Sequence, residues 1–211
     1  MNQAASVTKK RSKILSMALI ALFAALTAVL SQIAIPTPWQ IPISLGNLAG
    51  FLAVGLLTWE EAALSQVVWV LLGVVGAPVF SGMGSLSRLV GPTGGYIIGY
   101  IVSAVAAGLI LTKIGYRFWK MVAALVVGLL LCYLFGTVWY VIVMKQTSFW
   151  AALLACVFPY IPFDLVKIVL VSLLSLKLRP ILKTAESKEE PPPGTCSGRR
   201  FVMPGKSYAG R

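Results

Sequence analysis

Residues 121–144 read MVAALVVGLLLCYLFGTVWYVIVM, a stretch without a single charged side chain. A helix needs about 20 largely apolar residues to cross the hydrocarbon core of a bilayer, so this stretch predicts a transmembrane helix. Further apolar runs flank it on both sides, namely 14–35, 43–57, 62–77, 94–111 and 162–182. We therefore predict an all-α integral membrane protein, a bundle of six transmembrane helices.

The composition of the whole chain supports a membrane location. Of its 211 residues, 58% are hydrophobic and 11% are charged, with a mean hydropathy of +0.88, whereas a soluble domain is about half apolar and about a quarter charged. The chain has no histidine, and Cys132, Cys156 and Cys196 lack the close spacing of zinc ligands. We expect the protein to bind neither a cofactor nor a metal ion, and we expect that it is not an enzyme.

The basic residues predict the orientation. The formal net charge is +12, and cytoplasmic loops of membrane proteins carry an excess of Lys and Arg. If the N-terminus is cytoplasmic, only Arg88 and Lys145 fall in outside loops and Lys167 falls within the last run. All other Lys and Arg residues then lie inside. We expect both termini to be cytoplasmic in a multi-pass protein of the cell membrane.

Three segments follow from these patterns. Residues 1–13 form a basic cytoplasmic N-terminal segment, and residues 14–182 form the six-helix membrane domain that binds the substrate. Residues 183–211 mix charges with a run of prolines and contain few apolar residues, which is typical of a disordered tail.

Asp164 and Lys167 are charged residues inside the last predicted span. Each costs at least a few kcal/mol at the centre of a bilayer, so such residues usually serve a function. At positions i and i+3 they share one face of a helix. One interpretation is a self-neutralising ion pair that fixes helix packing. We favour a second, in which the carboxylate and the ammonium bind a small polar ligand.

The segment 78–96 is the second candidate region, because its glycines and prolines predict a compact, non-helical outer loop. Arg88 in this loop could pair with an anionic ligand or lie at the lipid headgroups. A stripe of small residues then follows at four-residue spacing, which indicates close helix packing. The stripe consists of Gly91, Gly95, Gly99 and Ser103.

Polar and small residues within other runs add weaker signals. For Asn47 and Gln66 we favour hydrogen bonding between helices, although either could face a cavity. Ala21 and Ala25 give the first helix a smooth face for another helix, either within the bundle or on a partner.

Two motifs resemble a known family. Gly91-Pro-Thr-Gly-Gly-Tyr96, followed by Pro162-Phe-Asp-Leu-Val-Lys167, resembles the BioY family, the biotin-binding S components of energy-coupling-factor (ECF) transporters. The resemblance covers about residues 14–182. It implies a six-helix subunit that captures biotin from outside, with energy supplied by a transmembrane coupling protein and two cytoplasmic ATPases. It also implies that Ala21 and Ala25 dock on the coupling protein.

The resemblance implies roles for individual residues, since Asp164 and Lys167 match positions that contact the ligand. We expect Asp164 to accept a hydrogen bond from a ureido N–H of biotin. Lys167 would contact either the ureido oxygen or the carboxylate. The remaining candidates are Arg88, Thr93 and Tyr96 for the other end of the ligand, Tyr96, Tyr160 and Trp69 for the wall around its rings, and Asn47 facing the cavity.

Two alternatives to a biotin S component stay open at this stage. The chain departs from the usual family pattern at Pro42-Ile-Ser-Leu-Gly-Asn47, so an S component for another small vitamin is one of them. A stand-alone secondary carrier for a small solute is the other, although no inverted repeat is visible. An enzyme would need an acid–base pair that Asp164 alone does not provide.

Overall fold

The computed structural model describes residues 12–35, 43–81, 86–145 and 148–188 of the chain. In these ranges the chain is mostly helical, with one short pair of strands. The helices are α1 (Lys13–Gln32), α2 (Gly46–Leu56), α3 (Trp59–Val74), α4 (Leu86–Val90), α5 (Gly94–Ile114), α6 (Phe118–Met144), α7 (Phe149–Cys156) and α8 (Ile161–Lys188). Strands β1 (Ala34–Ile35) and β2 (Ile43–Ser44) pair in antiparallel fashion.

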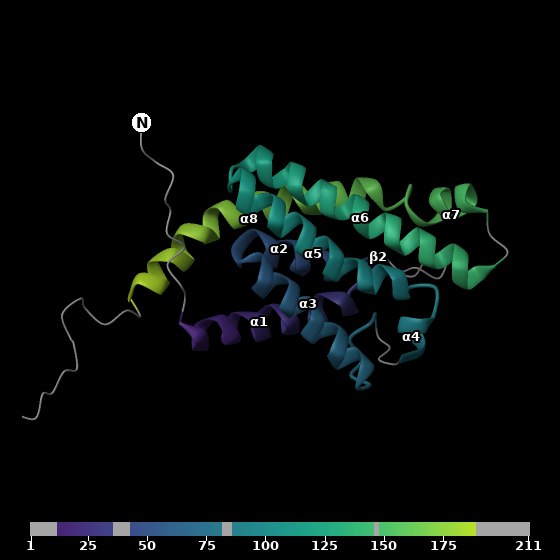
Figure 1. Ribbon diagram of the computed structural model, residues 1–211, viewed down its shortest axis with the longest axis horizontal. Helices are drawn as coiled ribbons and strands as arrows, with labels where there is room; N and C mark the ends of the chain where they lie inside the picture. Colours follow the sequence, from purple (N-terminus) through teal and green to yellow (C-terminus); the bar gives the residue numbers. More distant parts are fainter. Residues whose placement is uncertain (1–11, 36–42, 82–85, 146–147, 189–211) are drawn as a thin grey trace, which may run out of the picture.

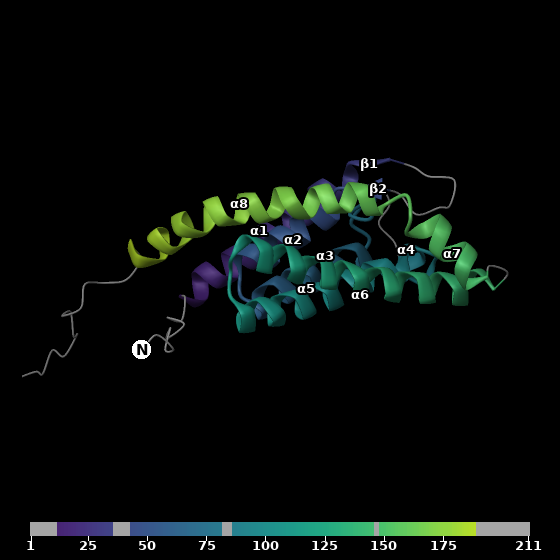
Figure 2. The ribbon, with the colours of Figure 1, turned by 90° about the horizontal axis from the view of Figure 1, so that it is seen from above.

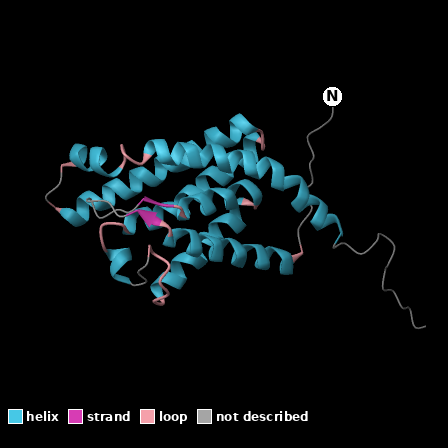
Figure 3. Ribbon diagram, turned by 180° about the vertical axis from the view of Figure 1, so that it is seen from behind, coloured by secondary structure: helices cyan, strands magenta, loops and turns pink. Residues whose placement is uncertain are grey.

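The long helices lie side by side along the longest axis of the molecule, as two perpendicular views show (Figures 1 and 2). One end of the bundle carries the β1–β2 pair, α4 and α7, which are labelled in Figure 2, and Figure 3 shows the two strands in magenta; we call it the hairpin end. The other end carries the turn between α5 and α6 (residues 115–117), and we call it the turn end. Helix α1 begins and α8 ends at the turn end (Figure 1).

Each of the six apolar runs coincides with a helix: α1, α2, α3, α5, α6 or α8. Three of these helices, α1, α5 and α6, are long and apolar enough to cross a membrane. Helices α2 and α3 are shorter, with 11 and 16 residues. Helix α8 is long but carries Asp164, Lys167 and Lys177 within its apolar part. The structure therefore supports a helical membrane protein with three clear candidate spans.

Side-chain hydrogen bonds cap the first turns of two helices, α1 and α3. Ser12 accepts a hydrogen bond from the Leu15 N–H at the start of α1. At the start of α3, Thr58 and Glu61 form a capping box, in which each side chain accepts from the other residue's backbone N–H. Ser16 of α1 also donates to the buried Glu61 carboxylate, so the cap joins α1 to α3 at the turn end.

The predicted small-residue stripe is confirmed as a packing surface between α5 and α6 for Gly95, Gly99 and Ser103, whereas Gly91 precedes α5 and a Cβ atom there would meet the Ser87 carbonyl instead. A Cβ atom at Gly95 would overlap the Trp139 side chain, and one at Gly99 would press on Cys132. Ser103 lies against Gly128 of α6 in the same way. Because these positions carry glycine or serine, the two helices approach closely along most of their length.

Several boundaries differ from the predictions. The chain is mostly helical rather than purely helical, because the pattern gives no signal for strands of two residues. The predicted non-helical loop over 78–96 contains α4 and the first turn of α5, since its glycines flank the segment LSRLV instead of interrupting it. Helix α8 continues past Leu182 to Lys188. Residues 1–11 and 189–211 of the predicted terminal segments lie outside the described residues.

Candidate functional site

Asp164 and Lys167 lie near the start of α8 at the hairpin end. The helix begins at Ile161, with Pro162 in its first turn, where the missing N–H of proline is not needed. The Asp164 N–H donates to the Tyr160 carbonyl at 2.9 Å and continues the turn. Lys167 Nζ lies 2.8 Å from Asp164 Oδ1, and each side chain is 8% exposed. The spacing predicted this shared face, and the structure confirms it.

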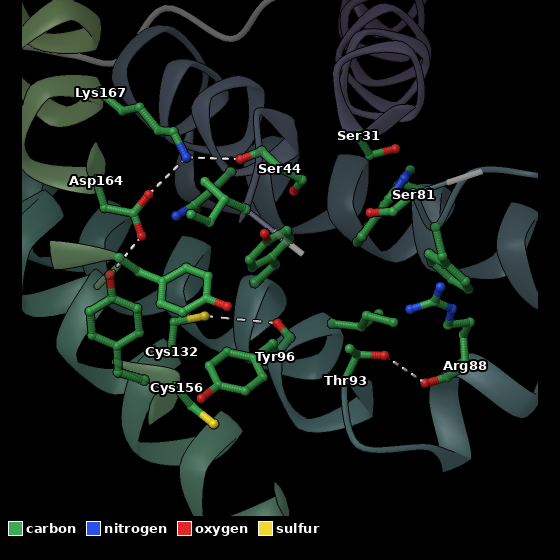
Figure 4. A pocket seen from close by; sticks show the side chains of 18 residues that line it. Ser31, Ser44, Ser81, Arg88, Thr93, Tyr96, Cys132, Cys156, Asp164 and Lys167 are labelled. Carbon is green, nitrogen blue, oxygen red and sulfur yellow. Dashed lines mark hydrogen bonds and ion pairs between the residues drawn. The ribbon is translucent and has the colours of Figure 1, made fainter. Parts of the chain in front are cut away.

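Other elements hold both members of the ion pair. The Tyr133 hydroxyl of α6 donates to Asp164 Oδ2 at 2.6 Å, and Lys167 Nζ donates to the Ser44 carbonyl of β2 at 2.8 Å (Figure 4). A buried charge is costly unless it is paired and hydrogen-bonded, and here each charge has two partners. The pair therefore ties α8 to α6 and to the β1–β2 hairpin.

These residues open into a pocket with about 780 Å³ of empty space, including its mouth. Binding pockets for small molecules combine apolar walls with a few polar groups, as this one does. All seven residues predicted to bind a ligand line it: Asn47, Arg88, Thr93, Tyr96, Tyr160, Asp164 and Lys167. Lining residues from eight different helices and one strand thus converge on one space, although they are far apart in the sequence.

Aromatic rings form one wall of the pocket. Trp69 of α3 packs edge-on against Phe80 with 5.1 Å between ring centroids, and it stacks on Tyr100 of α5 at 5.6 Å. The Trp69 indole N–H donates to the Val79 carbonyl at 3.3 Å, which fixes the ring orientation. A flat, apolar, rigid surface of this kind suits a small ring system in the ligand.

Arg88 lies on the opposite side of the pocket from Asp164 and Lys167 (Figure 4). Its helix, α4, is held against the start of α5, because the Thr93 hydroxyl donates to the Arg88 carbonyl at 3.2 Å. A Cβ atom at Gly94 would overlap the Leu89 carbonyl, so this turn requires glycine. Trp139 of α6 donates to the Gly91 carbonyl at 3.0 Å and braces the same turn. The glycine-rich motif therefore positions the arginine.

Several lining residues were missed from the sequence. Tyr133 and Ser44 contact the ion pair, and Cys132, Cys156 and Tyr100 also face the pocket. Tyr133 is one of three residues with a hydroxyl group in the apolar run 121–144, beside Thr137 and Tyr140, so the signal for it in the sequence is weak. Ser44 acts through its backbone carbonyl, which leaves no mark in a sequence.

Two further predictions concern side chains outside the ion pair. Gln66 of α3 donates to the Thr27 hydroxyl of α1 at 3.4 Å, which confirms the predicted hydrogen bond between helices. Asn47 is buried and lines the pocket instead.

Ala21 and Ala25 are exposed on the surface of α1. Among the residues that the structure describes, no three His, Cys, Asp or Glu side chains gather into a group that could hold a metal ion.

Comparison with known proteins gives consistent matches. A family model described as the BioY family matches residues 2–184. Biotin transporter BioY2 of Lactococcus lactis is 34% identical over 170 residues, which is 80% of this chain and 92% of the relative. Biotin transporter BioY of Thermotoga maritima is 33% identical over 159 residues, which is 75% of this chain and 92% of the relative.

A solved structure shares the fold. It is the crystal structure of the S-component for biotin from an ECF-type ABC transporter, and it superposes with a TM-score of 0.74 at 23% identity. The superposition covers 84% of this chain and 95% of that chain. At 23% identity this match shows that the two proteins share a fold. Membership of a family rests on the family model and on the relatives described above.

Proposed function

The chain belongs to the BioY family, and from that premise we propose that it is the biotin-capturing S component of an ECF-type transporter. It is a multi-pass membrane protein and a transporter component rather than an enzyme. The observation that carries the proposal is the buried Asp164–Lys167 pair, which faces a pocket with an aromatic wall. Biotin has a ureido group, a fused apolar ring and a carboxylate, and each part finds a matching surface.

The ion pair has hydrogen-bonding capacity left for the ureido group. Each oxygen of Asp164 accepts one bond, from Lys167 or from Tyr133, and a carboxylate oxygen can accept two. Lys167 donates to Asp164 and to Ser44, and an ammonium group has three donors. Asp164 can therefore accept from a ureido N–H while Lys167 donates to the ureido oxygen. These bonds involve charged groups and are stronger than neutral ones.

The carboxylate of biotin then points toward Arg88. A carboxylate beside Asp164 would be repelled, whereas Arg88 offers a positive charge on the far side of the pocket. The Thr93 hydroxyl lies beside Arg88, and Tyr96 lies between the two ends (Figure 4). The fused ring would pack against the aromatic wall around Trp69. This orientation selects between the two roles that the sequence left open for Lys167.

We propose that six helices span the membrane with both termini in the cytoplasm. In support, α1, α3, α5, α6 and α8 run along the bundle, and the shorter α2 lies among them (Figure 1). Lys113, Arg117 and Lys120 lie at the turn end, which the preference for cytoplasmic Lys and Arg assigns to the inside. The pocket at the hairpin end then faces outward, as capture from outside requires.

The partners in this proposal are a transmembrane coupling protein and two cytoplasmic ATPases. Ala21 and Ala25 offer the coupling protein a smooth face on α1, since both are exposed while Phe23 and Ala24 between them are buried. Exposed Leu22 lies beside the alanines. Small residues let two membrane helices approach closely, which is what a docking face needs.

Ala25→Leu tests the docking face. The larger side chain should keep the partner helix at a distance, so co-purification with the coupling protein and the ATPases should fall severalfold while biotin affinity is unchanged. Ala123→Leu is the matched control, because Ala123 is also exposed but lies on α6. Equal assembly of Ala25→Leu and Ala123→Leu would remove α1 as the docking surface.

Equilibrium binding to the purified full chain in detergent tests the function itself. Biotin is the ligand, and thiamine and riboflavin are the controls. Tight, selective binding of biotin is expected. A folded protein that binds thiamine or riboflavin instead would make it an S component for another vitamin, and a folded protein that binds none of the three would refute capture of a vitamin.

A further inference from the structure

A cluster of basic side chains lies at the turn end of the bundle, far from the pocket. We define the basic cluster as Lys113, Arg117, Lys120 and Arg179. The first three come from the end of α5, the turn and the start of α6, and the last comes from α8. Two parts of the chain that are distant in sequence thus supply cations to one region.

Contacts around Tyr116 bring these cations together. The Arg179 guanidinium stacks over the Tyr116 ring, and Lys120 Nζ donates to the Ile114 carbonyl at 2.6 Å. Lys113, Arg117 and Lys120 are all exposed. Within the ranges that the structure describes, no carboxylate forms an ion pair with any of these three side chains. Their positive charge is therefore available to a partner.

The surface beside the basic cluster is apolar. Trp119 is 79% exposed and Ile114 is 38% exposed, and both lie next to the cations in the sequence. Exposed tryptophan at the end of a membrane helix usually sits at the level of the lipid headgroups. A ligand that meets cations and an apolar surface together must carry a negative charge next to a hydrocarbon chain.

We infer that the basic cluster binds the headgroup of an anionic phospholipid, with the acyl chain passing beside Trp119. A free phosphate would use the cations but would leave the apolar surface unexplained, so the lipid fits better. Each Lys or Arg near the surface of an anionic membrane contributes about a fivefold gain in binding. The inference does not depend on which molecule the pocket binds.

Native mass spectrometry of the detergent-solubilised full chain provides the test. The probes are phosphatidylglycerol and phosphatidylcholine with identical acyl chains, each titrated alone and in competition. We expect preferential retention of phosphatidylglycerol. Lys120→Gln should lower its affinity by about fivefold, and the combined Lys113→Gln, Arg117→Gln and Lys120→Gln substitutions should abolish the preference. Lys145→Gln, at the opposite end of α6, is the matched control and should retain the preference.

Each outcome is decisive. Equal retention of the two lipids by the unmodified chain would overturn the inference, as would equal losses in Lys120→Gln and Lys145→Gln. Displacement of phosphatidylglycerol by excess inorganic phosphate alone would identify a phosphate site rather than a lipid site. Thermal unfolding of each variant checks that it remains folded. If the variant with all three substitutions does not fold, the comparison of Lys120→Gln with Lys145→Gln decides whether the lipid site exists.

Discussion

The charged side chains at the two ends of the bundle differ in burial and in pairing. At the hairpin end, Asp164 and Lys167 are buried, and each has two hydrogen-bonding partners. At the turn end, Lys113, Arg117 and Lys120 are exposed and form no ion pair among the described parts of the chain. A buried charge must be compensated by fixed protein groups, whereas an exposed one is compensated by water, lipid or salt.

The difference shows where specificity can arise. Fixed partners hold the Asp164 carboxylate in one orientation, so a ligand has to match it. The cations at the turn end are exposed and held by fewer contacts, so they can adjust to the headgroup of an anionic lipid. Substitutions at the hairpin end should therefore change ligand affinity strongly, and those at the turn end should change stability little.

Asp164→Asn should have the largest effect. The amide keeps the shape but loses the charged acceptor, and it leaves Lys167 without its carboxylate partner. Hydrogen bonds to charged groups contribute about 1.5–3 kcal/mol, so biotin affinity should fall at least about tenfold. Isothermal titration of the purified variant measures this, and circular dichroism checks that the helices remain. Unchanged biotin affinity would show that the Asp164–Lys167 pair serves helix packing and not ligand binding.

Arg88→Gln should come next. Arg88 is only partly buried, so we expect a loss of about tenfold in biotin affinity rather than more. Biotin amide, which lacks the negative charge, isolates the contact. The unmodified chain should bind the amide more weakly than biotin, and the variant should bind the two alike. A variant that still prefers biotin would place the carboxylate elsewhere.

Tyr133→Phe should have a smaller effect on affinity, of about fivefold. It removes the hydroxyl that orients Asp164 Oδ2 and leaves the ring in place. Tyr140→Phe is the matched control, because Tyr140 is buried on the same helix but does not line the pocket. Equal affinities of the two variants would show that the Asp164 carboxylate needs no support from α6.

Lys113→Gln should have the smallest effect. An exposed charge away from special features changes stability by less than about 0.5 kcal/mol, and the pocket is at the other end. The midpoint of thermal unfolding and the biotin affinity should both match the unmodified chain. A loss of stability comparable to that of Asp164→Asn would break the contrast between the two ends.

Much of the fold could be predicted because hydropathy is a local property. Each apolar run marks a helix, and the stripe from Gly95 to Ser103 marks the close approach of α5 and α6. The short helices α4 and α7 and the two-residue strands were not predicted, since segments of this length depend on what surrounds them. The extension of α8 to Lys188 was missed because its last turns are polar.

Part of the site could also be predicted, because a charge inside an apolar run is conspicuous in any sequence. Asp164 and Lys167 were found in this way, and the glycines around Arg88 pointed to the second region. Tyr133 and Ser44 were missed, because a tyrosine or a backbone carbonyl is ordinary until a charge lies beside it.

The sequence by itself determined the membrane character, the main helices and the pairing of Asp164 with Lys167 three residues later. These depend on transfer free energies and helical spacing, which act over a few neighbouring residues. Only the tertiary structure decided what surrounds the pair. Tyr133 lies 31 residues from Asp164, and Ser44 lies 123 residues from Lys167. Such contacts form only when helices pack, and packing is set by the shapes of all the side chains together.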